Sequence, residues 1–256
     1  MELTDTHTHL YAEQLAPDLD EVIQRAKDNR VQRFFLPNID STTIDSMLSL
    51  CDKDPDHFFP MMGLHPCSVQ ANYKEELATI EAALGKRSYC AIGEIGIDLY
   101  WDKTFLKEQT EAFALQVNWA KERQLPIVIH ARESFEEIFS VLDELNDDRL
   151  TGIFHCFTGT VEQAEKVLSY GGFKMGIGGV LTFKKAGLDR VLENIPLEHL
   201  VLETDSPYLA PSPFRGKRNE SSYLLYVAEK LALVSGKSLE EVARVTTANS
   251  REIFGI

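Results

Sequence analysis

The stretch LTDTHTHL (residues 3–10) places two histidines one residue apart in a short apolar segment. Successive side chains of a strand point to opposite faces, so His7 and His9 lie on one face and their imidazoles converge. This pair is a metal-binding pattern, but it is a weak one on its own. A histidine in an apolar strand is often a hydrogen-bonded core residue, and the remaining sequence must decide.

Four more polar residues follow apolar runs farther along the chain. They are Glu94 in CAIGEIGID, His130 in LPIVIHAR, His155 in LTGIFHCF and Asp205 in HLVLETDSP. The runs are separated by helical stretches of roughly twenty residues, which predicts βα units and a parallel sheet. The carboxyl ends of parallel strands meet at one edge, so we expect all of these side chains to gather there.

We predict eight strands, which lie at residues 2–6, 32–36, 58–62, 89–93, 126–130, 151–155, 172–177 and 199–203. The intervening segments carry apolar residues at the three- and four-residue spacing of a helix packed on a sheet. The expected fold is therefore α/β, a TIM-like (β/α)8 barrel that forms a single domain over residues 1–256. Ser238 and Glu241 make a capping-box pattern, which predicts a C-terminal helix.

These strand-end residues would be costly to bury as purely structural groups, because each desolvated side chain would need its own partners. Six ligands exceed the three of a typical catalytic zinc site, which favours two metal ions and a bridging carboxylate. Glu94 is the expected bridge. Asp205 is expected to be a ligand, a general base for metal-activated water, or both. The ligand types do not select one metal, so Mg²⁺, Mn²⁺ and Zn²⁺ are all candidates.

Two residues near the same edge are candidates for substrate contacts. His65, in MMGLHP, either contacts a substrate oxygen or is a loop residue before Pro66. Arg132 lies two residues beyond His130 and faces the same side if the strand continues. Its guanidinium suits a phosphate, and the alternative is a salt bridge near Glu133.

The loop after Glu94 holds three further residues of interest. Asp98 either orients a ligand or contacts the substrate. Tyr100 and Trp101 either stack on bases or cover the barrel mouth, and covering is the simpler interpretation.

The formal net charge of −14 argues against a broadly basic surface for nucleic acid. A polyanionic substrate must then be bound locally, by metal ions and by the cations Lys184, Lys185, Arg215, Lys217 and Arg218. No apolar run approaches the roughly 18 residues of a membrane helix. The DTHTHL motif begins at residue 5, which leaves no room for a cleaved signal peptide before it. The four cysteines form no CxxC pair, so we expect a soluble, cytoplasmic protein with reduced thiols.

Seven motifs, taken in order, resemble those of the TatD family of metal-dependent deoxyribonucleases within the amidohydrolase superfamily. They are DTHTHL, GLHP, AIGEIGID, PIVIHAR, FHCFTG, ETDSPYLAP and RGKRNE, and together they span nearly the whole chain. Two segments depart from the family pattern. NESSY (residues 219–223) replaces the usual NEP sequence, and HARES (residues 130–134) replaces an HSRDA-like segment. Neither departure removes a ligand, but the substrate contacts can differ.

The resemblance implies a TIM-like barrel with a divalent metal site whose bridge is Glu94. The implied ligands are His7, His9, Glu94, His130, His155 and Asp205. The resemblance also implies that His65 contacts the scissile phosphate and that Arg215 and Arg218 shape the substrate end of the site. The implied activity is exonuclease action from the 3′ end of DNA.

The expected reaction is hydrolysis of a phosphodiester at single-stranded DNA ends, with no membrane association and no obligate protein partner. Metal-activated water attacks phosphorus, and Asp205 handles the proton. One alternative is an amidohydrolase-type enzyme acting on an amide or ester, such as an aminoacyl ester of tRNA, because the same nucleophile attacks a carbonyl. A second alternative is a non-catalytic binding protein stabilised by metal. The full ligand set and the absence of a basic surface count against it.

Overall fold

Eight parallel strands form a ring, and their polar carboxyl ends share one edge. They are β1 (Leu3–Asp5), β2 (Val31–Pro37), β3 (Phe58–Met62), β4 (Ala91–Asp98), β5 (Ile127–Arg132), β6 (Gly152–Phe154), β7 (Phe173–Ile177) and β8 (Leu200–Leu202). The computed structural model describes all residues from 1 to 256. Strands pair in sequence order from β1 to β8, each consecutive pair in parallel. The predicted (β/α)8 barrel is confirmed.

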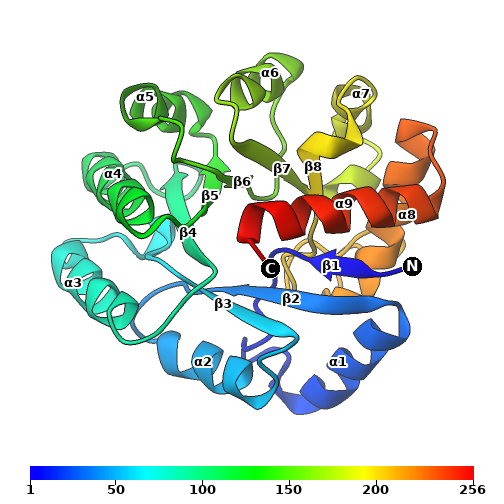
Figure 1. Cartoon of the computed structure of the whole chain (residues 1–256), viewed down its shortest axis with the longest axis horizontal. Coiled ribbons are helices and arrows are strands. Elements are labelled where there is room, and N and C mark those ends of the chain that lie inside the picture. Colours follow the sequence, from blue (N-terminus) through cyan, green and yellow to red (C-terminus); the bar gives the residue numbers. More distant parts are fainter.

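Nine α-helices accompany the strands, and most of them lie outside the ring (Figure 1). They are α1 (Leu19–Asp28), α2 (Ile44–Lys53), α3 (Tyr73–Leu84), α4 (Leu106–Arg123), α5 (Phe135–Leu145), α6 (Val161–Ser169), α7 (Leu188–Leu192), α8 (Leu224–Ser235) and α9 (Leu239–Phe254). The helices bury apolar residues on their inner sides, as α5 does with Ile138, Phe139 and Leu142. The predicted C-terminal helix begins after Ser238, whose side chain accepts from the Glu241 backbone N–H, but the reciprocal bond of a capping box is absent.

The fourth and fifth strands extend beyond their predicted ends. The prediction ended them at residues 93 and 130, but β4 continues to Asp98 and β5 to Arg132. Their register shifts between Ile92 and Ile95, and the pairing then resumes until Asp98 lies opposite Arg132. Glu94 and His130 therefore lie inside strands rather than at their ends, because backbone pairing continues past the end of each apolar run.

The ring closes between β1 and β8 through the segments that follow these strands. The Thr6 N–H donates to the Leu202 carbonyl at 3.0 Å, and the Asp205 N–H donates to the His7 carbonyl at 2.9 Å. The His9 N–H then donates to the Ser206 carbonyl at 2.7 Å. The closure of the barrel thus brings residues 7 and 9 beside residue 205, although almost the whole chain separates them in sequence.

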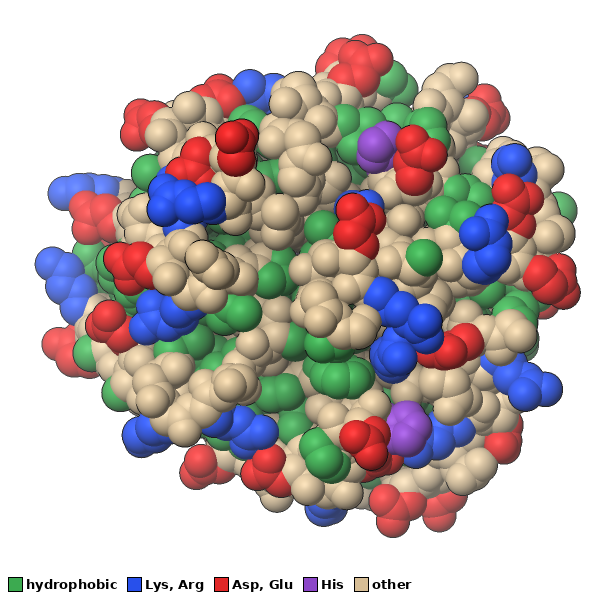
Figure 2. Space-filling model, in the orientation of Figure 1, with side chains coloured by type: hydrophobic (Ala, Val, Ile, Leu, Met, Phe, Trp, Pro, Cys, Tyr) green, Lys and Arg blue, Asp and Glu red, His purple; other side chains and the backbone are tan.

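The opposite, amino-terminal end of the ring is covered by α9. The Phe254 ring stacks on Phe35 with centroids 3.9 Å apart, and the Asn249 side chain donates to the Leu197 and Leu200 carbonyls at the start of β8. Figure 1 shows α9 crossing this end of the barrel. On the same face, Figure 2 shows acidic and basic side chains interspersed. The amino-terminal end is therefore a packed stabilising layer, which leaves the carboxyl edge for chemistry.

None of the helices combines the length and the hydropathy needed to cross a bilayer. All four cysteines are free.

Candidate metal centre

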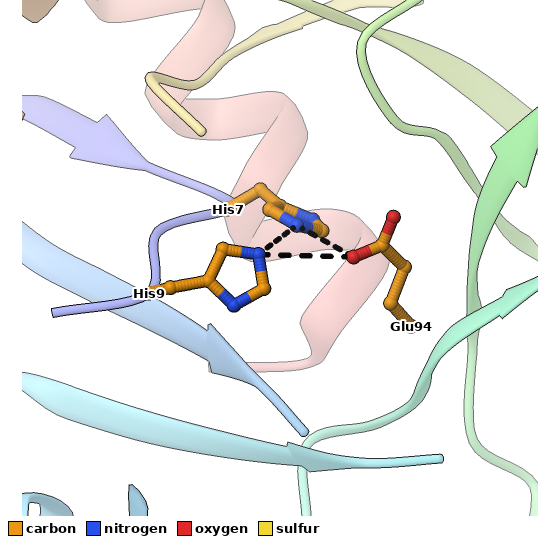
Figure 3. Close-up of side chains that lie close together, drawn as sticks. All are labelled: His7, His9 and Glu94. Atoms are coloured by element: carbon orange, nitrogen blue, oxygen red, sulfur yellow. Dashed lines mark hydrogen bonds and ion pairs between the residues drawn. The ribbon is translucent and has the colours of Figure 1, made fainter. Parts of the chain in front are cut away.

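The first cluster of polar side chains contains the two histidines that follow β1. The Nε2 atoms of His7 and His9 lie 3.3 Å apart, and both face the Glu94 Oε2 atom, at 3.1 and 3.8 Å (Figure 3). The Asp205 Oδ1 atom is 3.8 Å from the His7 Nε2 atom and 3.5 Å from the His9 Nε2 atom. Two imidazoles and two carboxylates thus point at one small volume.

The second cluster uses the other oxygen of the same glutamate. The Glu94 Oε1 atom lies 2.7 Å from the His130 Nδ1 atom and 3.5 Å from the His155 Nε2 atom. The rings of His7 and His155 stack with centroids 3.5 Å apart, so the two clusters adjoin. Glu94 is buried between them and presents one carboxylate oxygen to each.

The donor set fits divalent cations. Ligand nitrogens that bind zinc at about 2.0–2.1 Å in a tetrahedron lie roughly 3.3 Å from one another, which is the spacing of the His7 and His9 Nε2 atoms. Imidazole nitrogens and carboxylate oxygens together suit Zn²⁺, Mn²⁺ or Mg²⁺. The buried carboxylates also leave negative charge that a cation would balance. These residues therefore fit a metal centre.

Three of these histidines have a partner on the ring nitrogen that faces away from the cluster. The His130 Nε2 atom lies 2.8 Å from the Asp98 Oδ2 atom, and the His155 Nδ1 atom lies 2.9 Å from the Glu203 Oε1 atom. Because a carboxylate only accepts, the hydrogen bond from His130 to Asp98 and the ion-pair contact of His155 with Glu203 favour a proton on the outer nitrogens, which would leave the inner nitrogens to a metal ion. The His9 Nδ1 atom lies 2.9 Å from the Tyr11 hydroxyl.

His65 has the opposite arrangement. Its Nδ1 atom accepts from the Cys67 backbone N–H at 3.0 Å, so in the neutral ring the proton sits on the Nε2 atom. That atom faces the Glu94 Oε1 atom at 3.4 Å. His65 is thus held as a hydrogen-bond donor beside the second cluster, an arrangement that suits a substrate oxygen better than a metal.

Burial and neighbouring charges shift the pKa values of Glu94 and His155 in opposite directions. Burial alone would raise the pKa of Glu94, but the neighbouring imidazoles of His65, His7 and His155 hold it well below its ordinary value. Burial alone would lower the pKa of His155, but the Glu203 and Glu94 carboxylates raise it to about 10. Without a cation, a protonated His155 balances these carboxylates, so metal binding must displace that proton.

Asp205 is placed by the turn that follows β8. Its backbone φ is +57°, a left-handed conformation that aspartate tolerates better than most residues. The buried Asn219 side chain donates to the Thr204 and Tyr208 carbonyls on either side of it. The NESSY segment therefore keeps a structural asparagine that fixes the Asp205 turn.

The predicted substrate contacts differ in their surroundings. Arg132 is exposed at the end of β5 and stacks on Tyr100, while Arg215 stacks on Phe183 with 4.4 Å between the guanidinium carbon and the ring centroid. Arg218 instead makes two hydrogen bonds to the Asp18 carboxylate, at 2.6 and 2.8 Å. The Arg218 guanidinium is engaged in a structural ion pair, and a substrate contact would require this pair to open.

Lys184, Lys185 and Lys217 are exposed in the loops that follow β7 and β8. Asp98 contacts His130 rather than open solvent, since it is 3% exposed. Hydrogen bonds from His130 and from the Tyr100 backbone outweigh its burial and lower the pKa of Asp98 to about 2.

Three residues of the site were not singled out in the sequence. Glu203 precedes Asp205 by two residues, so the period of a strand would have placed both on one face. Asn219 lies inside the RGKRNE motif, but the spacing of residues along the sequence does not predict its hydrogen bonds to the Asp205 turn. Tyr11 follows His9 by two residues, and the same alternation would have found it.

Comparisons with known proteins agree with this architecture. The family described as TatD related DNase matches residues 4–255. A protein of Bacillus subtilis named uncharacterized metal-dependent hydrolase YabD is 41% identical over 255 residues, covering 99% of each chain. A protein of Erwinia tasmaniensis named 3′-5′ ssDNA/RNA exonuclease TatD is 31% identical, covering 98% of this chain and 99% of its own.

A solved structure extends the comparison to three dimensions. The TatD homologue YjjV of Escherichia coli superposes with a TM-score of 0.93 at 27% identity, over 99% of this chain and 98% of its own. The barrel and its loops therefore follow a known arrangement over nearly their whole length.

Proposed function

This chain belongs to the TatD related DNase family and is a metal-dependent hydrolase acting on ester bonds, and we propose that it removes nucleotides from the 3′ end of single-stranded DNA. The observation that carries the proposal is the position of Glu94 between two imidazole pairs, with one carboxylate oxygen toward each. Paired cation sites that share a carboxylate are suited to displacement at phosphorus.

In this proposal the two clusters would hold two divalent cations, with Mg²⁺, Mn²⁺ and Zn²⁺ as candidates. His7, His9 and Asp205 would hold one cation, His130 and His155 would hold the other, and Glu94 would contribute a carboxylate oxygen to each. When bound, the cations lower the pKa of water and offset the charge that develops on the phosphoryl oxygens.

The side chains of the protein supply the remaining parts of the reaction. Asp205 takes a proton as the water oxygen forms its bond to phosphorus, and returns it to the leaving oxygen as the old bond breaks. The His65 Nε2–H group donates to a phosphoryl oxygen and stabilises the transition state. Arg132 and Arg215 bind neighbouring phosphates as local cations on an acidic protein.

The choice of a single-stranded 3′ end is supported by the name of the Erwinia relative, which includes both the polarity and the nucleic acid. The metal centre lies at the carboxyl edge of the barrel, among the βα loops, a place that suits a chain end better than the middle of a duplex. RNA stands beside DNA in that name, so a matched RNA belongs in the test.

The test is cleavage of end-labelled single-stranded DNA by protein stripped of metal and resupplied with Mg²⁺, Mn²⁺ or Zn²⁺. We expect a ladder that shortens from the 3′ end, requires metal and is lost in Asp205→Asn. A 5′-blocked strand is expected to be degraded and a 3′-blocked strand to survive. His199→Gln, which alters a histidine at the amino-terminal end of the barrel, is the matched control and should retain full activity.

Other results would redirect the proposal. Degradation of RNA with DNA left intact would identify RNA as the substrate. Internal cuts would exclude exonuclease action. Cleavage of neither nucleic acid, with hydrolysis of an aminoacyl ester of tRNA or of another carboxylic ester, would identify a carbonyl hydrolase.

A further inference from the structure

Two aromatic side chains extend from the loop after β4, at the same edge of the barrel as the metal centre. Tyr100 is 49% exposed and Trp101 is 73% exposed, and their rings meet edge to face with centroids 4.8 Å apart. A side chain that packs over the barrel mouth loses solvent exposure to the residues beneath it. Most of the Trp101 side chain remains exposed, so packing does not explain its position.

Arg132 lies against both rings. Its guanidinium carbon is 3.8 Å from the Tyr100 ring centroid and 5.4 Å from the Trp101 ring centroid. At these distances the guanidinium makes cation–π contacts with the rings, and no hydrogen bond or ion pair within the protein engages its N–H groups. Unlike Arg218, which an aspartate engages, Arg132 keeps its positive charge available.

The loop is fixed to the metal centre through one carboxylate. The Tyr100 backbone N–H donates to the Asp98 Oδ1 atom at 3.0 Å, while the Asp98 Oδ2 atom contacts the His130 Nε2 atom at 2.8 Å. Gln109 of α4 holds the Asp98 backbone from behind, by accepting from its N–H and donating to its carbonyl. The aromatic pair is therefore attached directly to a residue that contacts a metal-site histidine.

We propose that Tyr100, Trp101 and Arg132 form a stacking site for an unpaired nucleobase of the substrate, close to the scissile phosphate. The proposal rests on the nucleic-acid hydrolysis proposed above. Exposed aromatic faces bind bases of any sequence, because every base has a π face, and a neighbouring arginine adds a phosphate contact. A base in a duplex is already stacked, so this site selects single-stranded nucleic acid.

The fluorescence of Trp101 is an intrinsic probe of this site. The chain has two tryptophans, of which Trp119 is 3% exposed and Trp101 is 73% exposed, so a ligand in solution reaches only Trp101. We would titrate Asp205→Asn, which should bind without cleaving, with a thymidine pentamer and with a pentamer of the same phosphates lacking bases. Binding is followed separately by the anisotropy of a dye on the oligonucleotide.

We expect quenching of Trp101 by the thymidine pentamer alone, and binding that is about tenfold weaker in Trp101→Ala and Tyr100→Ala. Trp101→Phe should restore most of the affinity. Leu233→Ala, which removes an apolar side chain of α8 that is 80% exposed, should leave both quenching and affinity unchanged. In the cleaving enzyme, Trp101→Ala should raise KM for DNA with little change in kcat.

Equal quenching by the pentamer without bases would show that Trp101 senses phosphates and would overturn the stacking site. Unchanged affinity in Trp101→Ala, with cleavage of DNA intact, would overturn the stacking site while the proposed function stands. Absence of both binding and cleavage for every oligonucleotide would instead reject the proposed function, and the stacking site with it.

Discussion

The Nδ1 atom of His155 lies 2.9 Å from a carboxylate oxygen of Glu203, and both side chains are buried in the barrel. The same Glu203 oxygen accepts from the Cys156 backbone N–H at 2.5 Å. Glu203 therefore fixes both the side chain and the backbone at the end of β6. It acts as a positioning residue, since it approaches the metal centre only through His155.

Glu203→Gln removes this charge at constant size and is predicted to weaken metal binding by about 10- to 100-fold. The same change should lower the pKa of His155, because its strongest carboxylate partner is lost. The measurements are competition with a chelator for the metal and NMR titration of His155 in metal-free protein. Glu198→Gln, at the exposed amino-terminal end, is the control. Equal metal affinity in wild type and Glu203→Gln would refute the role.

His65→Ala is predicted to reduce kcat by about 10²–10³-fold and to leave metal affinity unchanged, because His65 is held as a donor and not as a ligand. His65→Gln keeps an N–H donor and should recover part of the rate. Metal content after dialysis separates the two roles. A loss of bound metal in His65→Ala would mean that the imidazole is a ligand after all.

Tyr11→Phe is predicted to lower the metal affinity of the first cluster by about tenfold. The Tyr11 hydroxyl donates to the Pro37 carbonyl, so its lone pair accepts from the His9 Nδ1–H group and leaves the His9 Nε2 atom as a ligand. Removal of the hydroxyl should let the His9 proton move to the Nε2 atom in metal-free protein, which ¹⁵N NMR would detect.

Tyr89→Phe is the control for this change, since the Tyr89 hydroxyl also contacts a backbone carbonyl but lies away from the site. An unaltered His9 tautomer in Tyr11→Phe would count against the positioning role.

Asp5→Asn is predicted to change how stability depends on pH. Burial raises the pKa of Asp5 from 3.8 to about 7, although Thr204 donates two hydrogen bonds to it. Between these values the folded protein binds a proton that the unfolded chain lacks, so stability falls as pH rises from about 4 to about 7. The fall attributable to this carboxyl is at most about 4 kcal/mol.

The asparagine variant lacks this titration. Relative to wild type, it should gain stability as the pH is raised from 4 to 8, measured by urea unfolding in the presence of EDTA. A stability difference that stays constant over this range would contradict the assignment.

The sequence alone determined the class of fold and the gathering of the ligand candidates. Apolar runs alternating with amphipathic stretches require βα units, and parallel strands put their carboxyl ends at one edge. Periodicity and chain direction, which are local properties, are enough to place His7, His9, His130 and His155 at one edge of the sheet.

The tertiary structure decided what each nitrogen and oxygen does. Only the closure of the ring showed that Asp205 joins the first cluster, and only the rotation of the Glu94 side chain assigned one oxygen to each cluster. Partners such as Glu203 and Asn219 depend on polar contacts of 2.5 to 2.9 Å between separate segments of the chain. Spacing along a chain does not encode such contacts, because side-chain packing fixes them after the strands have met.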